Sequence, residues 1–369
     1  MTTVTAPPNG ATKGEKPSRS AARVNMLRRF MAGEGFVAVL IVVYIVAVSP
    51  FASGMISERN AINVLSNLWP LAIIVVGQTF VLVLGGIDLS QAALINITNT
   101  FGALLLAQAL NANTFTSTIF WGTMLGADGG PFATAGGGGV ILAILIMVTI
   151  GALLGSLNGF AVAKFGMPPF MVTLGTLLLF NAISVWMTHS ENVAALPPEY
   201  LQIGQGGFGG PFTYAMVIAL VLAIAAHFVL SSTPFGRWLY ASGINKKTAI
   251  ISGVPYKRVL ISAYTISAVF ATIGGILYST RLGAGRPTLG GDTLLLDVIG
   301  AAVIGGISLF GGKGSVLGAF LGAIFFVVLS NSLNLLNLPF TIVFIVKGLV
   351  IIAAALLDVA RRRVLGGTP

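Results

Sequence analysis

The spacing of the charged residues is the feature that most constrains how this chain can fold. Apolar stretches of about 20 residues, long enough to cross a bilayer, follow one another along most of the sequence. Only 8% of the 369 residues are charged, whereas soluble domains contain about a quarter. Because so few charges cannot cover a water-soluble protein of this length, most of the chain must be solvated by hydrocarbon. The sequence therefore predicts a membrane protein with many spans.

The apolar stretches define the expected membrane segments. A hydrocarbon layer of about 30 Å requires about 20 helical residues, and the candidates are roughly residues 36–53, 62–84, 92–110, 139–163, 170–188, 213–231, 260–279, 294–310, 315–336 and 339–358. The stretch 294–310 is short and interrupted by glycine, which predicts a broken or re-entrant segment. The expected fold is all-α: a polytopic integral membrane helical bundle with about ten transmembrane segments, some of them broken or re-entrant.

The 20 Lys and Arg residues predict the orientation of these segments. With ten spans and the N-terminus inside, 16 of the 20 fall in cytoplasmic segments, in keeping with the positive-inside rule. Nine spans would instead place Arg361, Arg362 and Arg363 outside. Although the net charge is +10, these charges flank apolar spans and form no soluble basic face, which argues against nucleic-acid binding. Both termini are therefore expected in the cytoplasm.

This topology divides the chain into three regions. Residues 1–33 are expected to be a disordered, basic cytoplasmic tail, since they are too long and polar for the start of a cleavable signal peptide. Residues 34–360 form the transmembrane domain, and residues 361–369 form a short cytoplasmic tail. Within the domain, residues 232–259 form a basic cytoplasmic loop.

Several kinds of chemistry lack the residues that they need. The chain has no cysteine and two histidines, so neither a metal site nor a catalytic nucleophile is expected. Residues 311–314 (GGKG) resemble a phosphate loop, but Ile307 and Gly314 stand where that loop needs a glycine and a Ser or Thr. Ionisable residues inside the spans are few, Asp88, Asp297 and Lys347 among them, and form no visible ion relay. The chain is therefore expected to be neither an enzyme nor a nucleotide-binding protein, and to hold no cofactor.

Uncharged polar side chains inside the spans are the remaining candidates for a translocation path. A path of neutral donors and acceptors suits an uncharged polar solute such as a sugar, although such side chains also join helices by hydrogen bonds. Asn96 and Thr100 are four residues apart and share a helical face. The candidates for the path or its gate are Gln78, Asp88, Asn96, Thr100, Asn158 and Thr173.

Asp88 follows a Gly-Gly pair that could break its span. Either Asp88 or Ser90 caps the helix that begins near Gln91, or Asp88 holds the break open near a gate. Residues 83–90 (VLGGIDLS) are echoed by residues 303–310 (VIGGISLF). The echo indicates either an internal repeat, which is common in transporters, or a chance likeness between glycine-rich segments.

Three ordered motifs resemble the permease subunits of ribose- and xylose-type ABC sugar importers: residues 77–90 (GQTFVLVLGGIDLS), residues 301–315 (AAVIGGISLFGGKGS) and residues 235–245 (FGRWLYASGIN). The resemblance covers about residues 60–360. It implies a bacterial inner-membrane protein that acts with a second permease subunit, identical or paralogous, cytoplasmic ATPase subunits that bind the ATP, and a periplasmic sugar-binding protein. The solute would be a sugar or a related polyol.

The basic loop is expected to contain a short cytoplasmic helix that couples the permease to the ATPase. Gly243 would free the turn before it, and Asn245 would cap its first turn. Ser252 and Gly253 would end it, because glycine is favoured where a helix terminates in a left-handed residue. The alternative is a merely solvated connector.

The apolar residues of this helix, Ala249, Ile250 and Ile251, are expected to bury against the ATPase. Lys246, Lys247 and Ile250 depart from the residues typical of the family, which leaves the identity of the ATPase open.

Two other functions remain open at this point. A branched-chain amino-acid-type ABC permease shares the general fold, and an ion-coupled secondary carrier would need no ATPase. The sequence favours the sugar permease through the motif at residues 77–90.

Overall fold

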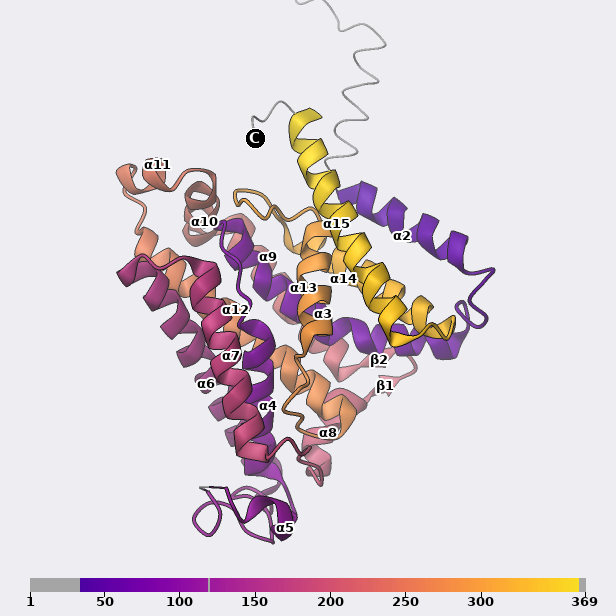
Figure 1. Cartoon of the computed structure of the whole chain (residues 1–369), viewed down its shortest axis with the longest axis vertical. Helices are drawn as coiled ribbons and strands as arrows, with labels where there is room; N and C mark the ends of the chain where they lie inside the picture. The colour runs from indigo at the N-terminus through magenta and orange to yellow at the C-terminus, as the bar shows by residue number, and fades with distance from the viewer. Residues whose placement is uncertain (1–33, 119, 365–369) are drawn as a thin grey trace, which may run out of the picture.

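The computed structural model describes residues 34–118 and 120–364, whose regular secondary structure is almost entirely helical (Figure 1). The helices and strands are α2 (Glu34–Val48), α3 (Glu58–Val83), α4 (Gln91–Leu106), α5 (Ala112–Phe115), α6 (Gly136–Phe165), α7 (Pro169–Thr188), α8 (Pro198–Gln205), β1 (Gly207–Gly209), β2 (Phe212–Thr213), α9 (Tyr214–Ser232), α10 (Pro234–Ile244), α11 (Lys246–Ile251), α12 (Tyr256–Leu282), α13 (Asp292–Ile304), α14 (Val316–Leu335) and α15 (Phe340–Val364). The predicted all-α bundle is confirmed.

Each of the ten predicted spans contains one apolar helix. Seven of these helices are long and apolar enough to cross a membrane, namely α3, α6, α7, α9, α12, α14 and α15. The other three, α2, α4 and α13, are shorter. The 13 residues of α13 extend about 20 Å, less than the hydrocarbon thickness of about 30 Å. The short segment expected at 294–310 is therefore present, whereas the shortness of α2 and α4 was not predicted.

The terminal regions predicted from the sequence lie partly outside the described residues. The basic tail predicted at residues 1–33 lies outside the described residues, as do residues 365–369. The last helix is longer than the span predicted at 339–358, because α15 continues to Val364 and includes part of the segment assigned to the C-terminal tail.

The helices pack around α3, α4, α12 and α14, whose residues are mostly buried. One apolar cluster joins α3 to α2, α9, α13, α14 and α15, and a second joins α4 to α6, α7 and α8. Residues of α12 belong to both clusters, so this helix connects the two sides of the bundle that Figure 1 shows left and right of centre.

Glycines allow the closest of these contacts. Gly151, Gly155 and Gly159 are spaced four residues apart and form one face of α6. A Cβ atom at any of the three would overlap α12, at Thr272, Ala268 or the backbone of residue 261. Small residues at this spacing are the usual means by which membrane helices approach closely.

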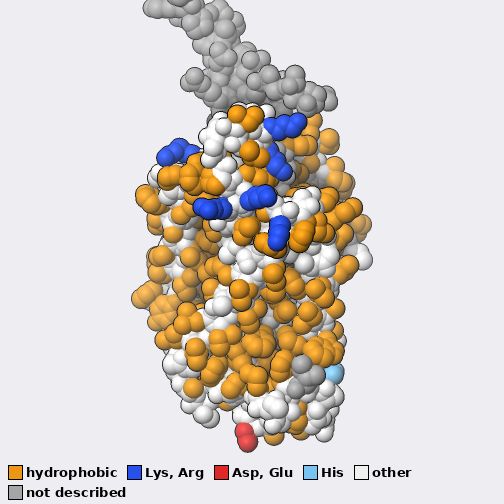
Figure 2. All heavy atoms as spheres, turned by 90° about the vertical axis from the view of Figure 1, so that its left-hand side faces the viewer, with side chains coloured by type: hydrophobic (Ala, Val, Ile, Leu, Met, Phe, Trp, Pro, Cys, Tyr) orange, Lys and Arg blue, Asp and Glu red, His pale blue; other side chains and the backbone are white. Residues whose placement is uncertain are grey.

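The surface separates apolar from basic side chains. In Figure 2, apolar side chains cover most of the face formed by the left-hand helices, and Lys and Arg side chains gather toward one end. The exposed basic residues of the segment from α10 to the start of α12 are Arg237, Lys246, Lys247, Lys257 and Arg258. A belt of exposed apolar side chains with charge at its end is the surface of an integral membrane protein.

Candidate functional site

The predicted break after α3 is present and is formed by glycine. Gly85 adopts a left-handed conformation (φ +78°), and its amide donates to the carbonyl of Leu82 at 2.8 Å. The chain then runs without regular structure to α4, which begins at Gln91. Irregular backbone of this kind is tolerated at membrane depth only where protein or a cavity surrounds it.

Asp88 anchors this irregular segment. Its carboxylate accepts hydrogen bonds from the amide of Ser90 at 3.0 Å, the hydroxyl of Ser90 at 2.5 Å and the hydroxyl of Ser267 on α12 at 2.7 Å. The side chain is buried. The helix-cap interpretation is wrong, because Ser90 occupies the N-cap position of α4 without a side-chain cap bond and Asp88 bonds instead to Ser90 itself. Asp88 therefore fixes the break against α12.

Two further side chains extend this polar cluster. Asn158 on α6 donates to the hydroxyl of Ser90 at 2.8 Å, and Gln91 donates to the hydroxyl of Ser267 at 2.8 Å. The cluster thus joins α4, α6 and α12 around the break. Gln91 and Ser267 were not predicted as site residues. For Ser267, nothing in the neighbouring sequence distinguishes this serine from others inside the spans.

Asn96 and Thr100 lie on one face of α4, as their spacing predicts, and that face packs against α7. The Asn96 amide donates to the Asn181 side chain at 2.7 Å, and its oxygen accepts from the amide of Gly290 at 2.6 Å. Thr100 and Ser184 hydroxyls lie 3.0 Å apart. Both side chains are therefore engaged in joining parts of the same chain.

The other two path candidates are also buried. Thr173 on α7 donates to the carbonyl of Ile87 in the broken segment at 3.2 Å. Gln78 is fully enclosed, and neither atom of its amide has a hydrogen-bond partner among the residues that the structure describes. None of the six predicted path residues lines the polar cavity described below. Their role in a path remains a prediction.

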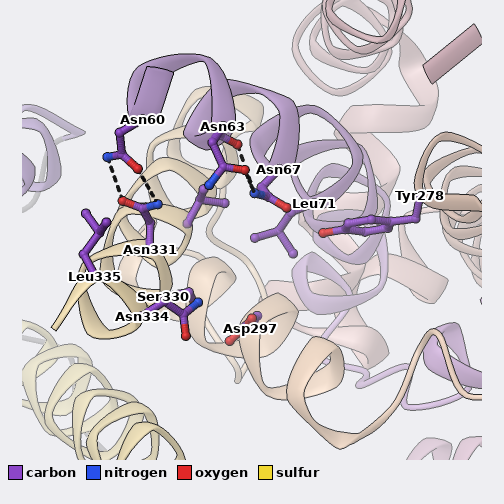
Figure 3. Close-up of a pocket in the computed structure, with 11 residues that line it drawn as sticks. Asn60, Asn63, Asn67, Leu71, Tyr278, Asp297, Ser330, Asn331, Asn334 and Leu335 are labelled. Atoms are coloured by element: carbon purple, nitrogen blue, oxygen red, sulfur yellow. Dashed lines mark hydrogen bonds between the residues drawn. The ribbon is translucent and has the colours of Figure 1, made fainter. Parts of the chain in front are cut away.

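A polar cavity of about 290 Å³ lies among α3, α12, α13 and α14 (Figure 3). Its lining residues are Asn60, Asn63, Asn67, Leu71, Tyr278, Asp297, Val327, Ser330, Asn331, Asn334 and Leu335. Side chains of α3 form one wall, and Asp297 and Asn334 lie on the wall facing them (Figure 3). Sequence reasoning did not select this set as a site. The available signal was the spacing of Asn60, Asn63 and Asn67, which places three amides on one helical face.

Some of the cavity amides are paired with one another. Asn60 and Asn331 exchange two hydrogen bonds of 2.9 and 2.8 Å, which join α3 to α14. Asn67 donates to the Asn63 side chain at 3.2 Å, and the guanidinium of Arg281 donates to the side-chain oxygens of both. These pairs give the α3 wall a fixed arrangement.

Asp297 brings a charge into the cavity and is paired with Lys347 of α15. The ammonium nitrogen lies 2.8 and 2.9 Å from the two carboxylate oxygens. Side-chain exposures of 5% for Lys347 and 15% for Asp297 place the ion pair inside the protein. Sequence reasoning noted both residues but gave no reason to pair them.

The short helix predicted in the basic loop is present as α11. Asn245 caps it by accepting a hydrogen bond from the amide of Thr248 at 3.0 Å, Ser252 follows its last residue, and Gly253 is left-handed (φ +84°). Ile250 and Ile251 are 49% and 87% exposed. The expectation for Ala249 is wrong, because this side chain is buried within its own chain and is not available to a partner.

The structural role of Gly243 differs from the one predicted. It lies within α10, and a Cβ atom there would overlap the carbonyl oxygen of Val83 and approach the amide of Gly312. That amide and that carbonyl form a hydrogen bond of 2.8 Å. Gly243 is therefore required for close contact and does not free a turn. We call the contact of Val83, Gly85, Gly243, Gly311 and Gly312 the glycine junction.

The glycine junction brings together the two echoed segments and the basic loop. A Cβ atom at Gly85 would lie 3.2 Å from the carbonyl oxygen of Phe310, and one at Gly311 would lie 2.9 Å from that of Gly243. The Tyr240 hydroxyl donates to the carbonyl of Gly314 at 2.6 Å, and burial raises the pKa of this hydroxyl. α10 thus contacts both the segment that follows α3 and the segment that follows α13.

Comparison with known proteins gives consistent matches. A sequence model for the permease component of the branched-chain amino acid transport system matches residues 60–355. The ribose import permease RbsC of Bacillus subtilis is 33% identical over 318 residues, covering 86% of this chain and 89% of that protein. The RbsC of Haemophilus influenzae is 31% identical over 327 residues (88% and 91%), and the xylose permease XylH of Escherichia coli is 28% identical (84% and 86%). No solved structure matches the chain.

Proposed function

This chain belongs to that family of ABC-transporter permeases, and we propose that it is the membrane subunit through which an ATP-driven importer carries a sugar or related polyol into the cell. The observation that supports a sugar most directly is the match to ribose import permeases over nearly their whole length. The branched-chain alternative is supported only by the description of the family. The chain is a transport component and not an enzyme.

The energy would come from a separate ATPase subunit that binds the ATP. The failed phosphate loop at residues 311–314 supports this division, since Gly314 occupies the position of the required Ser or Thr. A periplasmic binding protein would deliver the solute, and a second permease subunit would complete the path. The chain would lie in a bacterial inner membrane with both termini in the cytoplasm, where the basic end of α10–α12 would face the ATPase.

We expect uptake to require ATP and all the subunits. Vesicles with the permease, its ATPase and its sugar-loaded binding protein should accumulate ribose or xylose when ATP is supplied to the ATPase side. Vesicles with this chain alone and an imposed proton or sodium gradient should accumulate neither sugar. Gradient-driven accumulation by the chain alone would favour the secondary carrier and contradict the importer.

The docking surface for the ATPase would be the exposed face of α11. Ile250 and Ile251 project from a short helix whose neighbours Lys246 and Lys247 are exposed. An exposed apolar pair on a short helix fits a partner groove with an apolar floor. At the glycine junction, α10 contacts the segments that follow α3 and α13. A displacement of α11, which follows α10, would therefore be passed directly to both of these segments.

Replacing Ile250 by Asp is expected to weaken co-purification with the ATPase and to lower sugar uptake in parallel. The substitution places a carboxylate in a contact that excludes water, which costs several kcal/mol if the charge stays unpaired. The protein should still insert, because no span is altered. Pull-down of the ATPase and uptake in the same vesicles measure the two effects.

Lys247→Gln is the matched control and should leave both quantities close to wild type, because an exposed charge pair contributes little. Lys246 is unsuitable as a control, since its ammonium lies 4.6 Å from the centre of the Tyr256 ring. If Ile250→Asp changes neither association nor uptake, α11 is a solvated connector and the docking proposal is wrong.

A further inference from the structure

The polar cavity lies at the far end of the bundle from the glycine junction. α3 and α14 are antiparallel, because Asn60 bonds to Asn331 near one end while Gly314 approaches Val83 at the other. The 21 residues from Asn63 to Val83 correspond to about 30 Å of helix, close to the thickness of the hydrocarbon layer. In the proposed orientation the cavity is therefore on the periplasmic side, where solute would be received.

Three polar groups of the cavity wall retain unused hydrogen-bonding capacity. The side chain of Asn334 is exposed and makes no hydrogen bond within the part of the chain that the structure describes. The hydroxyl of Ser330 is buried, with no acceptor or donor among the described residues. The Asp297 carboxylate has about four lone-pair positions, and one ammonium group cannot occupy them all. Buried polar groups normally find partners, so this wall has room for a ligand with hydroxyl groups.

The charge balance of the cavity favours a neutral ligand. Lys347 compensates Asp297 at 2.8 Å, and the other lining side chains are amides, a serine, a tyrosine and aliphatic groups. The guanidinium of Arg281 is not part of the lining and is engaged by the side-chain oxygens of Asn63 and Asn67. A carboxylate inside a membrane bundle is costly and usually marks a substrate pathway. A charge-compensated carboxylate beside free amide and hydroxyl groups can accept hydrogen bonds from a polyol without attracting cations strongly.

The volume of the cavity and its aromatic side chain also suit a small ligand with hydroxyl groups. A volume of about 290 Å³ is at the lower end of the range for small-molecule sites, which begins at about 300 Å³. Tyr278 adds an aromatic ring to the lining (Figure 3). Such a ring has an apolar body and a polar tip and can contact the C–H groups of a sugar ring.

We propose that this cavity is a binding site for the carried monosaccharide, in which Asp297 accepts hydrogen bonds from sugar hydroxyls and Lys347 positions the carboxylate. The inference rests on the proposed function, because it takes the solute to be a sugar. It assigns Asp297 and Ser330 to direct contact with the solute, with the exposed Asn334 beside them in the lining. It does not depend on which ATPase docks at α11.

The absence of cysteine from the chain allows a direct test on the purified full-length permease, without the ATPase. Asn334→Cys would introduce a single thiol at the cavity, and Asn113→Cys would introduce one at an exposed residue of α5. The rate of labelling by a maleimide is measured with ribose, with xylose and with glycine betaine, which has no hydroxyl group. We expect ribose or xylose to slow labelling at position 334 several-fold and to leave position 113 unchanged, and glycine betaine to slow neither. Equal rates at position 334 with and without both sugars would overturn the proposal.

The contribution of Asp297 is tested in the same assay. Adding Asp297→Asn together with Lys347→Met to Asn334→Cys removes both charges and leaves no unpaired ion in the membrane. We expect the sugar concentration for half-maximal protection to rise about ten-fold, the effect of losing a hydrogen bond to a charged group. Unchanged protection would show that Asp297 does not contact the sugar. Because no ATP is used, failure of this site and failure of ATP-driven uptake are separate results.

Discussion

Replacing Gly243 by valine is expected to reduce ATP-driven sugar uptake to less than about a tenth of the wild-type rate while the protein still reaches the membrane. The added Cβ atom would overlap the carbonyl oxygen of Val83 and lie 2.6 Å from the amide of Gly312, which that carbonyl accepts. Both contacts are to backbone, so no side-chain rotation can relieve them. Overpacking of this kind typically costs about 1–3 kcal/mol and sometimes more.

The backbone shift that relieves this overlap would separate α10 from the segments that follow α3 and α13. Binding of the ATPase at α11 should be retained, because Ile250 and Ile251 are untouched, so uptake should fall without loss of co-purification. Gly348→Val on α15 is the matched control, since a Cβ atom there meets nothing within 4 Å. If the Gly243→Val variant takes up sugar at the wild-type rate, the glycine junction does not transmit movement from α10 and α11 to the segments that follow α3 and α13.

Removing one member of the buried ion pair is expected to have the largest effect on stability. Asp297→Ala leaves the Lys347 ammonium, whose side chain is 5% exposed, without its partner. Uncompensated buried charges of this type cost about 3–5 kcal/mol. We expect a lower midpoint of thermal unfolding in detergent and less folded permease in the membrane.

The double variant Asp297→Asn with Lys347→Met separates charge from packing. It removes both ions, and replacement of a buried pair by uncharged residues is often neutral, so most of the lost stability should return. The comparison is made by thermal unfolding of the three purified proteins. Equal midpoints for wild type and Asp297→Ala would mean that the lysine reaches water and that the pair is not a buried one.

The sequence alone determined the features that depend on neighbouring residues. Apolar stretches of sufficient length predicted the positions of ten helices. In hydrocarbon every backbone hydrogen bond must be made within the protein, and a single apolar segment satisfies this requirement by forming a helix. The break at Gly85 and the short helix α11 were predicted in the same way. Both depend on a glycine or a capping side chain within a few residues, such as Asn245.

Tertiary structure alone decided which side chains meet. Asp88 and Ser267 are 179 positions apart and Asp297 and Lys347 are 50 apart, and the cavity takes residues from four helices. In a soluble protein the apolar face of a helix indicates where it packs. In a membrane the lipid-facing and the buried faces are equally apolar, so the pattern of a helix does not identify its neighbours. For this reason the sequence predicted the helices and the basic loop, while the polar cavity, the burial of Ala249 and the contact at Gly243 emerged only from the packed bundle.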